Sequence, residues 1–139
     1  MKNILVVFGL ITIIIGSVWA DREWGTMRVH ARMEQFTQFN EDVDNLFAAL
    51  QKYKEQVGSY PPGGNLEVSK ALQGRNPKNV IVIVGNKISV NEKGEFLDPW
   101  GTPLRFYFSD TGIMIHSAGP NRRFDDSTSP EPDDYYRSN

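Results

Sequence analysis

The feature that most constrains this chain is a long N-terminal stretch that contains no proline. An almost uninterrupted apolar run, Ile4 to Ala20, continues directly into a second segment, Asp21 to Val57. In that second segment apolar residues recur at gaps of three and four, so they line one face of an α-helix. The pattern predicts an apolar helix that becomes amphipathic, which favours an anchored or assembled protein over a free enzyme. The apolar positions are Val29, Met33, Phe36, Phe39, Val43, Leu46, Phe47, Leu50, Tyr53 and Val57.

Residues 1–20 have two interpretations, a secretory signal peptide or a membrane anchor. Lys2 before the apolar run and Val18-Trp19-Ala20 after it fit a cleaved signal. An anchor needs roughly 17–25 apolar residues, and Trp19 and Trp24 lie where interfacial aromatic residues are expected. Both interpretations export the rest of the chain. We favour an inner-membrane anchor with residues 21–139 on the periplasmic side, because the helical pattern continues through Asp21.

The size and charge of the chain exclude several classes. With 139 residues it allows one globular domain, residues 21–139 including the helix 21–57, after the N-terminal segment. A net charge of −2 gives no electrostatic case for binding nucleic acid. The chain has no cysteine, which excludes disulfides and thiolate metal sites.

Short elements follow the long helix. Gly58 is suited to end it, and the turn 59–64 contains two prolines and cannot be helical. Asn65 is expected to cap a short helix over 66–72. Gly74, Asn76 and Pro77 then break the chain again.

The remaining segments predict a small β-sheet. The run 80–84 is the most β-prone, and it is expected to turn toward 88–90. Residues 104–108 and 113–116 flank an Asp-Thr-Gly turn and predict a hairpin. From Ser117 onward the sequence predicts only loop. The expected fold class is therefore α+β.

Several local motifs resemble one known family. The long helix ends in Tyr53-x-Glu-x-x-Gly-x-Tyr-Pro, a corner Asp98-Pro-Trp-Gly leads into one strand, and Ser117-Ala-Gly-Pro-Asn leaves the next, with a later pair of aspartates. In this order they resemble the globular domain of the major pseudopilin of type II secretion systems, over roughly residues 36–134. The resemblance implies a pilin-like fold, a long N-terminal helix packed on a small antiparallel sheet with a C-terminal metal-binding loop. It also implies a structural role in a secretion or pilus-type machine, membrane attachment through the helix, and partners that are pseudopilin-like subunits or copies of the same chain.

The N-terminus departs from that family. The family carries a glycine followed by Phe-Thr-Leu-Ile-Glu, whereas Gly9 is followed here by Leu-Ile-Thr-Ile-Ile with no acidic residue in the run. The alternative function is therefore an exported binding module, anchored or periplasmic, that is stabilised by calcium and does not assemble.

The C-terminal loop carries the only candidate site. Its side chains supply hard oxygen ligands, which Ca²⁺ prefers, and a metal would offset the entropy cost of closing an irregular loop. In the resembled family this loop binds Ca²⁺, and four positions match that pattern by place: Ser117, Asn121, Asp133 and Asp134. The alternative is a solvated acidic tail whose carboxylates neutralise nearby arginines. The candidate ligands are Ser117, Asn121, Asp125, Asp126, Asp133 and Asp134.

No active site can be assembled from the remaining residues. His30 and His116 are isolated in the sequence and suit ordinary surface or packing roles, and no phosphate-binding or zinc-type spacing is present. Asp42 and Asp44 lack the glycine and glutamate of a calcium loop and are assigned to the solvated face of the helix. Trp100 is expected to cover one end of the core, with ligand stacking as the alternative. We therefore expect neither an enzyme nor a small-molecule substrate.

Overall fold

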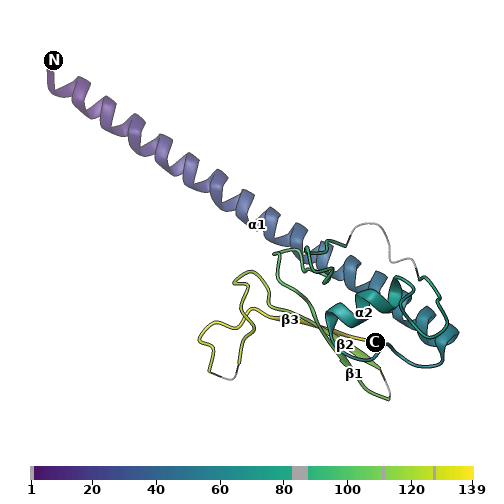
Figure 1. Ribbon diagram of the computed structural model, residues 1–139. Helices are drawn as coiled ribbons and strands as arrows, with labels where there is room; N and C mark the ends of the chain where they lie inside the picture. Colours follow the sequence, from purple (N-terminus) through teal and green to yellow (C-terminus); the bar gives the residue numbers. More distant parts are fainter. Residues whose placement is uncertain (1, 83–87, 111, 127) are drawn as a thin grey trace. The chain divides into compact units, whose positions relative to one another are not determined.

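A single long helix, α1 (Lys2–Val57), runs through both N-terminal segments, as predicted (Figure 1). It ends at the expected place. Gly58 has a φ of +106°, a conformation that glycine adopts without steric cost, and its amide donates to the carbonyl of Lys54 at 2.8 Å. Residues 59–64, the predicted turn, are not helical.

The computed structural model describes residues 2–82, 88–110, 112–126 and 128–139, with side chains from residue 26 onward. The chain forms two compact units, Met1–Phe36 and Thr37–Asn139. The predicted anchor or signal segment, residues 1–20, lies outside the residues whose side chains are described. Among the described residues, no helix is both long and apolar enough to cross a membrane.

In the part of the first unit whose side chains are described, residues 26–36, the apolar stripe of α1 faces solvent. Val29 and Met33 are each more than 60% exposed. In the second unit, the same stripe is buried, and Phe39, Val43, Leu46, Leu50 and Tyr53 are at most 2% exposed. The predicted amphipathic face is therefore confirmed as a core face from Phe39 onward.

Asp42 corrects one assignment on this helix. The sequence places it on the solvated face, but it is only 5% exposed and accepts a hydrogen bond from the side chain of Gln38 at 2.7 Å. It neighbours the buried Val43, so the buried face of α1 includes a polar residue beside the apolar stripe.

The second helix, α2 (Asn65–Leu72), shares the core with α1, and Val68 and Leu72 are buried there. The predicted cap is wrong. Gly64 is the N-cap, and its amide donates to the side chain of Glu67 at 3.1 Å. Asn65 instead lies in the first turn and points inward. Its side chain donates to the carbonyls of Phe96 and Leu104 and accepts from the amide of Phe96. An amide side chain offers both a donor and acceptors, so it can satisfy buried backbone groups on both segments.

The sheet has three antiparallel strands in the order β1 (Arg105–Phe108), β2 (Ile113–Ser117) and β3 (Tyr135–Ser138). The hairpin of β1 and β2 is confirmed. The expectation of only loop after Ser117 is wrong, because β3 pairs with β2 and Tyr135 lies opposite Ser117. The inward ring of Tyr135 stacks on Trp100 at 5.3 Å and lies 5.8 Å from the ring of Phe39.

The other predicted strands are not strands in the described residues. Residues 83–87 lie outside the description, and the flanking residues form only isolated bridges, Gln73 with Ile81 and Val90 with Phe96. The fold class α+β is confirmed, with one long helix and a small three-stranded antiparallel sheet. Figure 1 shows the three short strands next to one another, with the loop between β2 and β3 extending beyond them.

Candidate metal centre

The loop between β2 and β3 is closed tightly at its base. Because Ser117 pairs with Tyr135, the loop begins and ends at neighbouring positions. Gly119 has a φ of +64°, and a side-chain carbon there would lie 2.1 Å from the backbone oxygen of Asp133. Only glycine allows the two ends to pass so closely. The amide of Asn121 also donates to the carboxylate of Asp133 at 3.0 Å.

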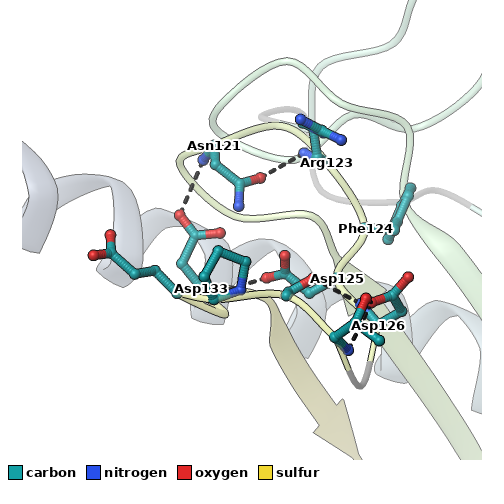
Figure 2. A pocket seen from close by; sticks show the side chains of 10 residues that line it. Asn121, Arg123, Phe124, Asp125, Asp126 and Asp133 are labelled. Carbon is teal, nitrogen blue, oxygen red and sulfur yellow. Dashed lines mark hydrogen bonds between the residues drawn. The ribbon is translucent and has the colours of Figure 1, made fainter.

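Three carboxylates from this loop converge. Asp125, Asp133 and Asp134 each offer an oxygen, and these atoms lie within 4.8 Å of one another. We call this group the carboxylate triad. Backbone amides of its members hold it together. The amide of Asp133 donates to Asp125 at 2.7 Å, and the amide of Asp125 donates to Asp134 at 3.0 Å. Figure 2 shows Asp133 between Asn121 and Asp125, with hydrogen bonds to both.

Two oxygens of the triad have no hydrogen-bond partner in the part of the chain that the structure describes. They are Oδ1 of Asp133 and Oδ1 of Asp134, and both are buried. The side chain of Asp134 is only 3% exposed. A buried polar atom without a partner typically costs 1–3 kcal/mol, and more if it is charged. A cation bound at the triad would supply the missing partner.

The donor set fits a hard divalent cation. All three side chains are carboxylates, and each commits its Oδ2 to a nitrogen donor. If each contributed its other oxygen, the triad would fill three of the 6–8 positions that Ca²⁺ takes, leaving the rest to water and backbone carbonyls. A cavity of about 530 Å³ adjoins the triad and is lined by Asn121, Arg123, Phe124, Asp125 and Asp133, among others.

The charge of the loop is stabilised by hydrogen bonds. The backbone amide of Asp133 holds the pKa of Asp125 below its ordinary value. The hydroxyl of Thr128 does the same for the pKa of Asp126. Both donors favour the ionised carboxylate, which is the form that binds a metal.

The other three predicted ligands lie in different arrangements. The side chain of Asn121 accepts the amide of Arg123 at 2.6 Å. Asp126 accepts both the amide and the hydroxyl of Thr128. Ser117 is fully buried and donates to Asp98 at 2.7 Å. The structure therefore brings the carboxylates of Asp125, Asp133 and Asp134 together, with the side chain of Asn121 beside Asp125.

Asp98 is the centre of a second hydrogen-bonded group, which we call the corner. Its Oδ1 accepts the amides of Trp100 and Thr102, and its Oδ2 accepts the hydroxyl of Ser117. Trp100 is 5% exposed and packs against Phe39 and Tyr135, which supports its predicted role of covering the core. Both oxygens of Asp98 are satisfied by the protein itself.

Sequence reasoning missed one residue at the triad, His116. Its Nε2–H donates to Oδ2 of Asp134, and both side chains are buried. The ring of His116 stacks on Tyr136 with centroids 4.1 Å apart and meets the edge of Phe124 at 4.7 Å. The pairing of β2 with β3 places His116 opposite Tyr136. Because the sequence does not predict β3, it carries no signal that His116 lies near the triad.

Comparison of the chain with protein-family models, with curated proteins and with solved structures finds no match.

Proposed function

We propose that this protein is a structural, pseudopilin-like subunit or accessory of a type II secretion or pilus-type machine. In this proposal it is held at the inner membrane by its N-terminal helix, and its periplasmic domain is braced by Ca²⁺. The observation that carries the proposal is the order of parts in the second unit. The end of a long helix packs on a small antiparallel sheet, and an acidic loop follows β2.

The motifs that resemble the pseudopilin family have structural roles at the matching places. The Asp98 corner leads into β1, and the Ser117-Ala-Gly-Pro loop leaves β2. The ring of Tyr60 after the helix stacks on Phe108 with centroids 5.6 Å apart. These contacts support a pilin-like domain in which the motifs build the fold.

The first unit supports a role in assembly. The apolar stripe of α1 that is buried from Phe39 onward is exposed at Val29 and Met33. An exposed apolar stripe on a helix suits contact with another apolar surface. In the proposed function, that surface belongs to neighbouring subunits.

The cation is tested by thermal unfolding of the full-length protein in detergent, with Ca²⁺ and then with a chelator. At tenfold excess over the dissociation constant, binding stabilises the fold by about 1.4 kcal/mol. The expected increase in melting temperature is roughly 4–7 °C. Extracellular sites commonly have dissociation constants of about 10⁻⁴–10⁻³ M, so millimolar Ca²⁺ is required. Mg²⁺ is expected to stabilise less, because it demands a smaller octahedral site and gives up water reluctantly.

Two matched variants locate the effect. Asp134→Ala removes a triad carboxylate and is expected to abolish the calcium shift. Asp44→Ala removes an exposed carboxylate on α1 that pairs with Arg137 at 2.6 Å, and is expected to keep the shift. An unchanged melting temperature on adding Ca²⁺ to the unaltered protein would show that the loop is only a solvated acidic segment.

Assembly is tested by cross-linking, for which the absence of cysteine gives a clean background. Val29→Cys and Met33→Cys place thiols on the exposed stripe, and Lys52→Cys places one on the exposed face of the second unit. We expect disulfide-linked copies or mixed adducts from the first two and few from the third, in cells with an active secretion machine. Equal cross-linking at all three positions, or none at any, would favour the non-assembling binding module.

A further inference from the structure

We propose that His116 is a positioning residue for the cation site, and that it fixes which oxygen of Asp134 faces the metal. This inference rests on the calcium-braced loop of the proposed function. It assigns a role to a buried histidine that neither the core nor the resembled motifs account for. His116 belongs to β2, whereas the triad belongs to the loop, so the role links the sheet to the site.

The first argument is the hydrogen bonding of Asp134. Its Oδ2 accepts from Nε2–H of His116 and from the amide of Asp125. Two donors occupy this oxygen, while Oδ1 of the same carboxylate is buried without a partner in the described part of the chain. The side chain is therefore held in one orientation, with a single oxygen left for a cation. Asp134 would bind through one oxygen only.

The second argument is that His116 cannot easily move away. Its side chain is 6% exposed. Tyr136 stacks on the ring at an interplanar angle of 17°, and Phe124 meets it edge-on at 70°. The guanidinium of Arg105 lies 3.5 Å above the ring of Phe124 and packs that ring in place. Contacts from β1, β3 and the loop thus hold the imidazole where its N–H reaches Asp134.

The third argument is general to metal sites. Groups that hydrogen-bond to ligands orient them, and removing such a group typically lowers metal affinity by 10–100-fold. Without His116, Oδ2 of Asp134 would lose one of its hydrogen-bond donors, and the carboxylate would be freer to rotate. The buried Oδ1 would then no longer be preset toward the cation. The expected consequence is weaker calcium binding by a domain that still folds.

Two substitutions separate the hydrogen bond from the ring. His116→Phe keeps an aromatic ring for stacking on Tyr136 but donates no hydrogen bond. His116→Gln removes the ring but keeps an N–H near the place of Nε2. Tyr107→Ala is the control, because it removes an exposed ring 6.3 Å from His116 that donates nothing to Asp134. The affinity of each full-length variant for Ca²⁺ is measured by titration calorimetry, and the melting temperature is measured in chelator.

We expect His116→Phe to raise the dissociation constant for Ca²⁺ by about 10–100-fold, and His116→Gln to raise it by less than about tenfold. Tyr107→Ala is expected to bind as the unaltered protein does. A purely structural role would change the melting temperature in chelator but leave the affinity of the folded variants equal. If phenylalanine prevents folding, His116→Leu is the donor-free variant.

The outcomes distinguish this inference from the proposed function. If the unaltered protein binds Ca²⁺ and the donor-free variant binds it equally well, His116 has no positioning role and the site itself stands. If His116→Gln loses as much affinity as His116→Phe, the ring and not the N–H matters, which also overturns the inference. If the unaltered protein binds no Ca²⁺, the cation site fails and the role of His116 fails with it.

Discussion

The corner is built on a buried aspartate and the carboxylate triad on half-buried ones, and the two groups use their carboxylate oxygens differently. At the corner, Asp98 accepts three hydrogen bonds, and both of its oxygens are engaged. At the triad, Asp133 and Asp134 each engage one oxygen and bury the other without a partner in the described residues. The corner is complete within the protein, whereas the triad leaves two buried oxygens that the proposed cation would engage.

The difference separates an aspartate that the protein itself satisfies from one that keeps an oxygen without a partner in the described residues. Burial alone does not distinguish them, because Asp98 is 3% exposed and the side chain of Asp134 is also 3% exposed. The number of buried oxygens without a donor does distinguish them, because an unpaired buried carboxylate oxygen is costly and needs a compensating partner. The corner should therefore contribute the same free energy of unfolding at any calcium concentration. The contribution of the triad should depend on the calcium concentration.

The largest expected effect is at the corner. Trp100→Ala is expected to destabilise the protein by about 3–5 kcal/mol, because the ring is buried against Phe39 and Tyr135. Urea unfolding of the full-length variant measures the loss, and we expect the same loss with Ca²⁺ and with chelator. A loss under about 1 kcal/mol would resemble an exposed substitution and would favour the ligand-stacking role.

A smaller loss is expected from the carboxylate of the corner. Asp98→Ala leaves the amides of Trp100 and Thr102 and the hydroxyl of Ser117 without their acceptor. Since hydrogen bonds to a charged group contribute about 1.5–3 kcal/mol, we expect a loss of about 2–3 kcal/mol. Asp98→Asn keeps one acceptor oxygen and should lose less.

Asp98→Ala also sharpens the comparison between the corner and the triad. Because Asp98 is not a member of the triad, the rise in melting temperature caused by Ca²⁺ should persist in Asp98→Ala. Loss of that rise would show that the corner and the triad form one site, with Ser117 as the link between them.

The smallest expected effect is a decrease in the free energy of unfolding at acidic pH. The pKa of Asp125 lies below its ordinary value of 3.8 in the folded protein, because the amide of Asp133 donates to it. As the pH falls through 3.8, the unfolded chain therefore takes up the proton first, and the free energy of unfolding decreases until the folded pKa is passed. Acid titration of the unfolding transition measures this loss.

Asp126 provides the matched control for the acid dependence. Its pKa is lowered by Thr128 in the same direction, but it is not a member of the triad. Asp126→Ala should remove part of the acid dependence and leave the calcium response intact. If it removed the calcium response as well, the triad would need a fourth carboxylate.

The elements predicted correctly from the sequence are those with local signals. Helical spacing and Gly58 define the end of α1, and the turn between 108 and 113 defines the hairpin. Strand β3 carries no such signal. It is held by contacts distant in the sequence, Tyr135 on Trp100 and Arg137 on Asn40 and Asp44.

The candidate site was predicted as a region but not as a set of residues. Composition shows that the loop is rich in oxygen donors, yet it does not show which of them converge. That choice depends on the path of the backbone, which Gly119 allows to pass close to Asp133. Asn121 and Asp126 instead hydrogen-bond to amides two residues ahead of them, a use of these side chains that competes with metal binding.

Because Ser117 pairs with Tyr135, the loop between β2 and β3 can change in length without changing the sheet. Its two ends are fixed side by side by the sheet, so added length changes only the closed segment between them. Each doubling of a flexible loop costs only about 0.6 kcal/mol in closure entropy. A peptide tag inserted between Asp126 and Asp133 should therefore leave β2 and β3 paired. The same tolerance would let related chains differ here in length without altering the sheet.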